Sequence, residues 1–450
     1  MMKKIIAFLL AAQMILTFAA CGSKPAESAP SLPPQEEEQM PSVELSFRLD
    51  TMEWTESATT EHGGETYTLI EGRCELPKLV LVDETGAEYQ PQGNSYMELL
   101  QIKAVENFNA AMKERMEKLQ EAYRENLASA EELFPQMMSG EFPWWQPFAH
   151  DIRSTVYKNG DLISVILLGY TSLGGAHPNS YYETYNFDLA TGEFVDYEDL
   201  AISEGGFRIA VAEFIRSYIY ATGMNEYYYD DFESYLFDFA YTHMAFDEQG
   251  MTVFFDEYTM GPHAAGIPTF LVPYDIFCDY LNDYGRALLA VSDESFALAD
   301  HREAQKLWGW FHMTTLPLDY KQSVESDGYT YYRVQDIATM GGLRTLLTSR
   351  VSEELADVWL AENSLRYKEI DGVLYGLDAD RGSSLELGST DYTVEFAGDG
   401  GKVIGTTKVY DTNQWDRVEK DFVVIDTLVT EYPFDWVDGE AIFTDFPYPY

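Results

Sequence analysis

The sequence predicts an α+β fold, in which antiparallel strands and helices occupy separate stretches of the chain. Alternating apolar and polar residues, typical of half-buried strands, recur in short segments such as residues 43–49 and 151–157. The Asn-Gly pair at residues 159–160 is a strong signal for a hairpin turn. Between these strand signals, residues 95–134 carry apolar side chains at spacings of three and four, which predicts one long amphipathic helix.

The length of the chain limits the number of domains, and its net charge limits the classes of partner. A chain of 450 residues can hold two folded domains, and we place them at residues 43–290 and 291–450. The formal net charge is −47, so the surface repels nucleic acid and anionic lipid and attracts basic proteins. We therefore expect no nucleic-acid partner. The 15% aromatic content, with 32 tyrosines, fits a strand-rich exported protein.

The first twenty residues have the pattern of a bacterial export signal. Lys3 and Lys4 precede an apolar run at residues 5–16 that is short for a membrane span. Phe18-Ala19-Ala20-Cys21 then resembles a lipobox, and this resemblance implies cleavage before Cys21 and lipidation of that residue. An ordinary signal peptide followed by a chance cysteine is the alternative. Residues 21–42, rich in Pro, Ser and Glu, are expected to form a disordered tether. We thus expect anchoring at the outer face of the bacterial cytoplasmic membrane.

Residues 43–170 are expected to form a small β unit, the long helix and a hairpin. Strands are predicted at 43–49, 66–70 and 78–82, with a turn at His62-Gly63-Gly64. Ser95 is the expected N-cap of the helix and Pro135 its stop, and a break near Asn126 is an alternative. The hairpin strands are 151–157 and 162–170, and residues 181–189 form the next strand. Further along, we expect helices at 207–220, 232–244 and 274–281, and strands at 251–258 and 269–272.

Two glycine-rich loops each carry a histidine. One contains Gly174, Gly175, Ala176, His177 and Pro178, and the other runs from Gly261 to Gly266 around His263. Rigid loops of this kind offer backbone groups and an imidazole to a surface. Our candidate binding residues are Gly174, Gly175, His177, Pro178, Tyr258 and His263.

The same histidines could serve a metal site, with Asp188, Asp256 or Glu257 as a third ligand. No His-x-x-x-His or cysteine pair supports this, and loop histidines are more often bonded to a neighbouring carbonyl. No Gly-x-Ser-x-Gly motif or phosphate-binding loop is present. We therefore expect no metal, no cofactor and no catalytic residues.

A set of short motifs resembles a known family. It comprises Gly174-Gly175-Ala176-His177-Pro178, Asn186-Phe187-Asp188 with Thr191-Gly192, Phe255-Asp256-Glu257-Tyr258, Gly266 and Val272-Pro273-Tyr274. Together they resemble the extracellular domain shared by RsiV-type anti-sigma factors and PdaC-type peptidoglycan deacetylases, over residues 43–281. The resemblance implies an extracytoplasmic α+β domain, which in the RsiV branch senses lysozyme by binding it. The sigma-binding segment of the one branch and the deacetylase domain of the other have no counterpart in this chain.

The C-terminal part is expected to pack helices on a curved antiparallel sheet, as in NTF2-like or cystatin-like domains. Helices are predicted at 292–314, 329–350 and 352–361, a hairpin at 367–377 and strands at 392–396, 402–409, 422–431 and 435–443. Residues 367–375, Asp378-Ala379-Asp380-Arg381-Gly382 and Trp436 resemble the IseA family of DL-endopeptidase inhibitors, over residues 328–446. This resemblance implies binding of a protein partner.

With Cys21 assigned to the anchor, Cys74 and Cys278 either form one disulfide or remain buried thiols. As a whole, the sequence predicts a lipid-anchored surface protein, not an enzyme, that binds a lysozyme or a peptidoglycan hydrolase as sensor or inhibitor. The alternative is a metal-dependent hydrolase that acts on cell-wall peptidoglycan. A third possibility is a purely structural envelope protein.

Overall fold

The computed structural model describes residues 45–90, 95–141, 145–175, 177–238, 242–382, 384–416 and 421–447. The predicted signal peptide, Cys21, the tether and Ala176 lie outside these ranges. Within them the α+β class is confirmed, because strands in four mostly antiparallel sheets alternate with blocks of helices. The described ranges contain no helix that is both long and apolar enough to cross a bilayer. The division near residue 290 stays a prediction.

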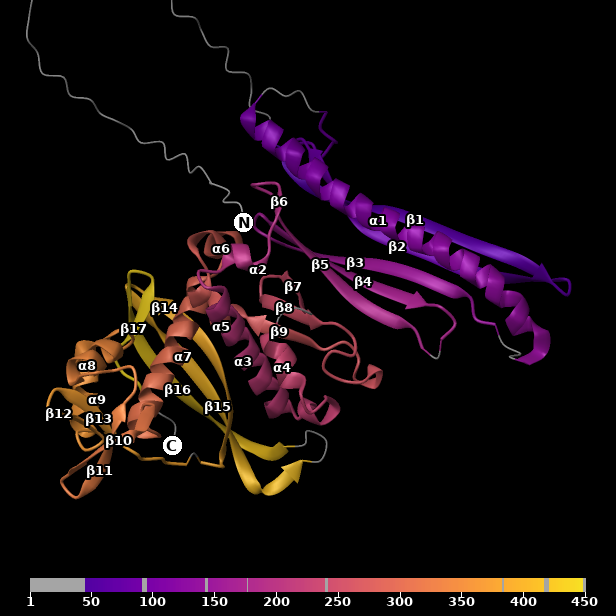
Figure 1. Ribbon diagram of the computed structural model, residues 1–450. Coiled ribbons are helices and arrows are strands. Elements are labelled where there is room, and N and C mark those ends of the chain that lie inside the picture. Colours follow the sequence, from indigo (N-terminus) through magenta and orange to yellow (C-terminus); the bar gives the residue numbers. More distant parts are fainter. Residues whose placement is uncertain are drawn as a thin grey trace, which may run out of the picture. The chain divides into compact units, whose positions relative to one another are not determined.

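The first sheet has six strands in sequential order (Figure 1). They are β1 (Ser46–His62), β2 (Glu65–Val82), β3 (Phe148–Asn159), β4 (Leu162–Ser172), β5 (Asn179–Asp188) and β6 (Glu193–Phe194). Only β2 and β3 pair in parallel, since the long helix α1 (Tyr96–Gln136) connects them as a crossover. The predicted hairpin at Asn159-Gly160 is confirmed, and Gly160 adopts a φ of 58°.

Two strands predicted separately, 66–70 and 78–82, are one strand, β2. The pairing of β1 with β2 continues without interruption through Gly72 and Pro77, which lie between the two predicted segments. Gly72 is required there because the Trp54 ring lies over it. A Cβ on residue 72 would come within 2.4 Å of that ring and 2.8 Å of Tyr123. The interruption in the sequence pattern therefore marks close packing, not a turn.

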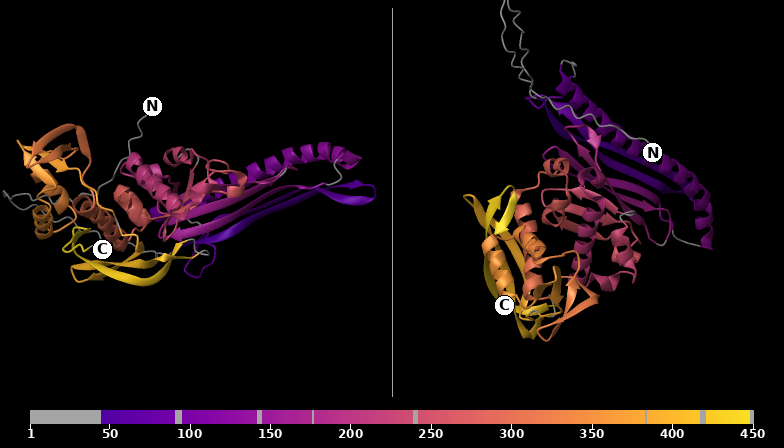
Figure 2. Two further views of the ribbon diagram at one scale, coloured as in Figure 1. Left: turned by 90° about the horizontal axis from the view of Figure 1, so that it is seen from below. Right: turned by 60° about the vertical axis from the view of Figure 1, so that its left-hand side comes forward.

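Helix α1 lies along β1 and β2 (Figure 1, Figure 2). Ser95 is its N-cap, as predicted, and accepts a hydrogen bond from the Glu98 amide at 3.1 Å. Pro135 does not stop the helix, which continues to Gln136 and into the π-helical turn η1 (Met137–Glu141). No break occurs at Asn126, whose side-chain amide bonds the Ala122 carbonyl within the helix. The buried face of α1 packs on the first sheet through Ala104, Phe108, Met112, Leu119 and Tyr123.

The next part combines a three-stranded antiparallel sheet with helices. Its sheet contains β7 (Thr242–Phe246), β8 (Gly250–Phe255) and β9 (Thr269–Pro273). The helices are α2 (Tyr197–Leu200), α3 (Glu204–Thr222), α4 (Phe232–Phe237), α5 (Tyr274–Phe277) and α6 (Asp283–Leu288), with 3-10 turns η2 (Met224–Tyr227), η3 (His263–Ala265) and η4 (Cys278–Tyr280). The helix predicted at 232–244 is therefore wrong at its end, because α4 ends at Phe237 and residues 242–244 belong to β7.

Tertiary hydrogen bonds explain why residues 242–246 form a strand. Asn186 on β5 donates its amide to the Met244 carbonyl at 2.9 Å, and the Met244 amide donates to Thr184 at 3.0 Å. The Phe246 amide donates to the buried Ser164 hydroxyl at 3.0 Å. The side chains of the first sheet thus hold the backbone of β7, which the aromatic-rich sequence alone does not reveal.

The C-terminal part has the predicted helices α7 (Asp293–His312) and α9 (Glu353–Glu362). The helix predicted at 329–350 is wrong, since it divides into β11 (Tyr329–Val334) and α8 (Met340–Thr348). The strands form two four-stranded antiparallel sheets where the sequence suggested one. The first sheet holds β10 (Leu318–Ser326), β11, β13 (Val373–Leu377) and β12 (Tyr367–Ile370), and the second β14 (Leu387–Ala397), β15 (Gly400–Asp416), β16 (Asp421–Val437) and β17 (Glu440–Phe443).

Cys74 and Cys278 are both free, buried thiols. Cys74 lies in β2 and Cys278 in η4. The disulfide alternative is therefore wrong for this structure, and the buried-thiol alternative agrees with it.

Candidate binding surface

The two glycine-rich loops meet, although His177 and His263 are 86 residues apart in the sequence. Their imidazole rings stack with centroids 4.0 Å apart and planes 14° from parallel. His177 follows β4, while His263 begins η3 in the connection from β8 to β9. Three of the six predicted binding residues, His177, Tyr258 and His263, thus form one cluster.

Tyr258 joins the two loops by a hydrogen bond to His177. The His177 Nδ1 atom lies 3.1 Å from the Pro178 carbonyl, which can only accept, so Nδ1 carries the hydrogen. In the neutral imidazole Nε2 is then an acceptor, and the Tyr258 hydroxyl, 3.1 Å away, donates to it. Burial and the nearby Glu257 carboxylate raise the pKa of Tyr258, which keeps this phenol protonated.

His263 is oriented by a carboxylate. Its Nδ1 contacts Glu257 Oε1, and the second Glu257 oxygen accepts the Ser180 backbone amide at 3.2 Å. The Glu257 side chain is only 8% exposed, so the carboxylate lies under the surface, whereas the His263 side chain is 39% exposed. Because Nδ1 faces the carboxylate, Nε2 is the atom of His263 that could accept a proton or a hydrogen bond from a ligand.

Backbone conformation presents Tyr258 to solvent. Tyr258 has a φ of 69°, which is uncommon for a tyrosine, and its side chain is 43% exposed. The chain then turns back, where a Cβ on Gly261 would lie 3.0 Å from the Tyr227 carbonyl oxygen. The Tyr229 amide donates to the Met260 carbonyl at 2.8 Å. The segment around η2 is thereby held against the loop of Tyr258.

The other predicted residues support the first loop. Gly174 adopts a φ of 75° and lies against Phe148. A Cβ added to Gly174 would come within 3.1 Å of the Phe148 ring. Gly175 is exposed and has only the His177 carbonyl nearby, at 3.8 Å. Pro178 supplies the carbonyl that fixes His177. Gly174 and Pro178 therefore shape the loop, and the side chains that reach the surface are those of His177, Tyr258 and His263.

Sequence reasoning missed the tyrosines that extend this surface. Tyr227 and Tyr229 are 61% and 41% exposed, next to the exposed carboxylates Glu226 and Asp230. The run Glu226-Tyr227-Tyr228-Tyr229-Asp230 was a visible signal, because three successive tyrosines cannot all be buried from one short turn. We call the set Tyr227, Tyr229, Tyr258, His177 and His263 the Tyr/His surface.

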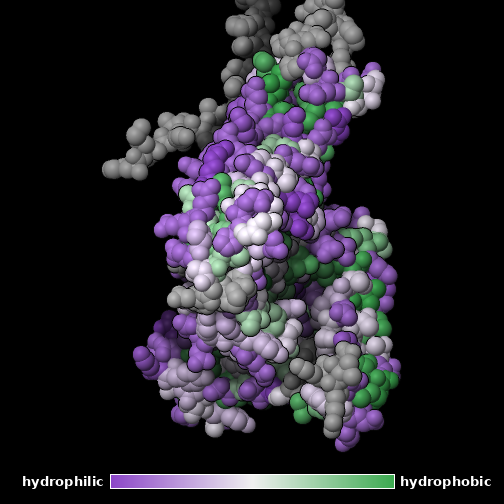
Figure 3. Space-filling view, turned by 90° about the vertical axis from the view of Figure 1, so that its right-hand side faces the viewer, coloured by the Kyte–Doolittle hydropathy of each residue, from purple (hydrophilic) through white to green (hydrophobic). Residues whose placement is uncertain are grey.

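The face of the molecule drawn in Figure 3 is largely hydrophilic, with scattered hydrophobic patches.

Of the three candidate third metal ligands, Glu257 contacts His263 in the cluster, whereas Asp188 and Asp256 lie in other environments. Asp188 accepts hydrogen bonds from the Ala190 amide and from the Thr191 and Tyr284 hydroxyls, and so closes the turn after β5. Asp256 faces His243 at 3.3 Å. In the part of the chain that the structure describes, no group of three or more His, Cys, Asp or Glu side chains is arranged to hold a metal.

A cavity of about 770 Å³ lies near β5 and β7. It is lined by Asp196, Glu198, Asp199 and Asp238 together with Arg208 and His243. Two of these carboxylates have local roles, since Asp196 and Asp199 form the capping box of α2. No pattern in the sequence indicated this cavity.

Three comparisons place part of the chain among known proteins. Residues 208–275 match the family described as protein of unknown function (DUF3298). A segment of 61 residues, 13% of the chain, is 33% identical to an esterase of Mycobacterium tuberculosis, and the match spans 27% of the esterase's length.

Two solved structures of DUF3298 proteins are also similar. One, from Bacteroides fragilis, is 15% identical, covers 53% of this chain and 96% of its own, and has a TM-score of 0.34. The other, from Pseudomonas aeruginosa, is 12% identical, covers 53% of this chain and 95% of its own, and has a TM-score of 0.31. Tyr227, Tyr229, Tyr258 and His263 all lie within residues 208–275, the segment that matches the DUF3298 family model.

Proposed function

We propose that this protein captures a basic cell-wall-active protein, such as a lysozyme or a peptidoglycan hydrolase, through the Tyr/His surface. The observation that carries the proposal is the meeting of three segments, around residues 177, 227–229 and 258–263, in one exposed aromatic surface. Tyrosine supplies a large contact area at a small cost in conformational entropy, and it is enriched among residues that dominate binding energy.

Charge supports a basic partner. Glu226, Asp230 and Asp231 are exposed beside the tyrosines, and the chain as a whole carries a net charge of −47. Arginine and lysine side chains of a partner can both pair with these carboxylates and stack on the rings. Long-range attraction would accelerate encounter and make the affinity fall as salt rises.

The proposal includes the predicted location. A lipid anchor at Cys21 would hold the binding surface at the outer face of the cytoplasmic membrane, where such enzymes act. Incorporation of a labelled fatty acid into the exported protein, and its loss in Cys21→Ser, tests this part separately. Export without labelling would refute the anchor and leave the binding proposal standing.

The binding test is a calorimetric titration of the folded protein with lysozyme and with hydrolases of the host envelope, at low and at physiological ionic strength. Tyr258→Ala should weaken binding by about tenfold or more if Tyr258 lies at the centre of the contact. Tyr320→Ala is the matched control, because Tyr320 is 62% exposed but lies on β10, outside the Tyr/His surface. No binding of any of these proteins at low ionic strength would rule the proposal out.

Hydrolysis is the second candidate function, and the Glu257–His263 pair favours it. A carboxylate that holds Nδ1 leaves Nε2 oriented to take a proton, as a general base requires. The local identity to an esterase also supports this candidate. Turnover of model esters or wall fragments that is lost in Glu257→Gln would favour an enzyme over a binding protein. Stoichiometric zinc that is lost in His177→Ala would favour the metal-dependent form, which acts on peptidoglycan.

A further inference from the structure

One edge of β16 is open over most of its length. This strand pairs with β15 from Asp421 to Asp435, but it pairs with β17 only from Phe434 to Val437. Among the described residues, no other strand or isolated bridge pairs with the outer edge of residues 421–433. An unpaired edge of this length is a template for an added strand.

Two hydrogen bonds show which backbone groups point outward. The Thr427 amide donates to the Asp426 side chain at 2.8 Å, and the Pro433 carbonyl accepts the Thr444 amide at 2.9 Å. Since the amide and carbonyl groups of alternate residues lie on the same side of a strand, Val429 and Glu431 face outward with them. Pro433, which has no N–H group, marks the end of the open edge.

The side chains along this edge are unusually apolar for an exposed strand. Val424, Ile425, Leu428 and Val429 are 47%, 61%, 37% and 59% exposed. Trp415, on the neighbouring end of β15, is 56% exposed. Contiguous exposed apolar side chains of this kind are typical of interaction sites.

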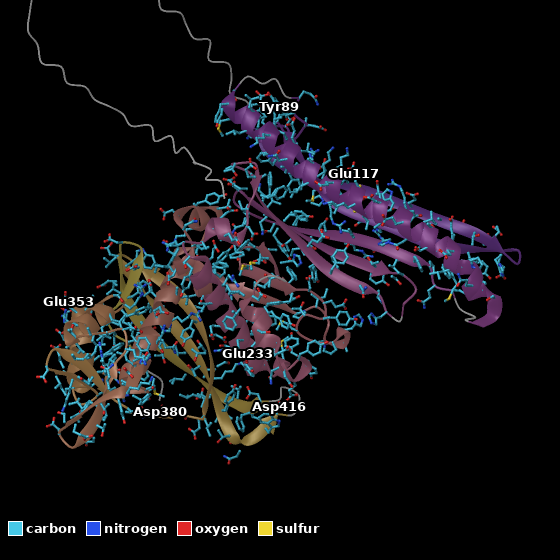
Figure 4. All side chains as sticks on the ribbon, viewed as in Figure 1. Tyr89, Glu117, Glu233, Glu353, Asp380 and Asp416 are labelled. Carbon is cyan, nitrogen blue, oxygen red and sulfur yellow. The ribbon has the colours of Figure 1, made fainter. Side chains whose placement is uncertain are left out.

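Acidic residues interrupt the apolar run. Asp421, Asp426 and Glu431 lie on β16 itself, and Asp416, labelled in Figure 4, lies on the same hairpin. Glu431 is paired with Lys402, and Asp421 accepts a hydrogen bond from the Tyr410 hydroxyl. The edge therefore combines open backbone groups, apolar side chains and excess negative charge.

We propose that the outer edge of β16 binds an extended segment of a partner protein as an additional strand, and that this segment alternates apolar residues with lysine or arginine. Backbone hydrogen bonds would supply affinity, while Val429 and its neighbours and the carboxylates would select the side chains. A second copy of this chain fits less well, because both copies carry the same large negative charge and the same edge carboxylates. The site lies on the C-terminal part and goes beyond the function proposed for the Tyr/His surface.

The test uses the full exported chain and a fluorescent eight-residue peptide of alternating valine and lysine, with anisotropy as the readout. The control peptide has the same sequence with alternate amides N-methylated on its pairing edge. We expect the unmodified peptide to bind and the methylated peptide to bind at least tenfold more weakly. Hydrogen exchange should show new protection at the Val429 and Glu431 amides when the unmodified peptide is present.

Two variants at position 429 separate the contribution of the backbone amide to peptide binding from that of the side chain. Val429→Pro removes one outward amide and leaves the ladder with β15 intact, so peptide affinity should fall about two- to tenfold, the effect of one hydrogen bond. Val429→Ala keeps the amide and should weaken binding less. Circular dichroism verifies that both variants fold.

Three outcomes would overturn the proposal. The first is equal binding of the methylated and unmodified peptides, which would mean that charge alone attracts them. The second is an absence of peptide binding at low ionic strength. The third is concentration-dependent dimerisation of the wild type that Val429→Pro abolishes, which would identify a second copy as the occupant of the edge.

Discussion

The buried histidine of α7, His301, offers a sharp test of the packing in the C-terminal part. It is 2% exposed, and the rings of Tyr432, Tyr392, Phe446 and Phe443 surround it at centroid distances of 4.5, 4.6, 5.2 and 5.6 Å. Its Nε2 atom is buried and has no hydrogen-bond partner among the described residues. Burial lowers the pKa of His301 to about 3 from the ordinary value of 6.5.

The sign of the pH effect follows from this shift. Below pH 6.5 the unfolded chain binds a proton at His301 that the folded chain does not bind until about pH 3. Acid therefore favours the unfolded state, and stability is lost as the pH falls through this window. At pH 5 the loss is about 1.36 × (6.5 − 5), or roughly 2 kcal/mol.

The perturbation is His301→Phe, which keeps a ring of similar size and removes the ionisable nitrogen. At pH 7 we expect the variant to be more stable by about 1–3 kcal/mol, the cost of an unpartnered buried polar atom. Between pH 7 and pH 5 this advantage should grow by about 2 kcal/mol. Urea unfolding of the full chain, followed by tryptophan fluorescence at both pH values, measures both quantities.

The neighbouring Asp300 has the opposite effect on the pH dependence of stability, and it is present in both the wild type and His301→Phe. Burial raises the pKa of Asp300 to about 6, so its cost to stability is present above pH 6 and disappears as the pH falls toward 3.8. Comparing His301→Phe with the wild type cancels this contribution. Phe311→Leu is the matched control, because Phe311 is equally buried on α7 but packs against Trp359 and Tyr367, so the variant should destabilise the protein about equally at both pH values. If His301→Phe and the wild type show the same pH dependence, the burial argument is refuted.

Three further predictions concern the first sheet and the thiols. Gly72→Ala should lower the free energy of unfolding by about 1–3 kcal/mol, because the new Cβ would collide with Trp54; an unchanged thermal midpoint would contradict this packing. Ser164→Ala should cost about 1–3 kcal/mol, since it leaves the Phe246 amide and the Asn186 side chain without their buried partner, and faster hydrogen exchange of the Phe246 amide should accompany the loss. Cys74 and Cys278 should react with a thiol reagent only after unfolding, because both thiols are buried. Burial also raises the pKa of Cys74 to about 11 and raises the pKa of Cys278 further. Alkylation of either residue in the folded protein, located by mass spectrometry, would disprove this.

The sequence alone was sufficient where the signal is local. The Asn159-Gly160 hairpin, the Ser95 cap of α1 and the α+β class follow from turn chemistry, capping and periodicity, which depend on neighbours in the chain. The two glycine-rich loops could also be recognised as candidate surfaces from their own residues. Their composition identified His177 and His263 but contained no information on the distance between them.

Tertiary structure decided the features that depend on residues far apart in sequence. Residues 242–246 form a strand because Thr184, Asn186 and Ser164 bond their backbone, and β2 continues through Gly72 because Trp54 lies over it. The stacked His177–His263 pair and the open edge of β16 likewise result from pairings that no local pattern encodes. Propensity and periodicity describe the preference of one segment on its own. A tertiary contact depends on the residues of two distant segments, so neither segment predicts it alone.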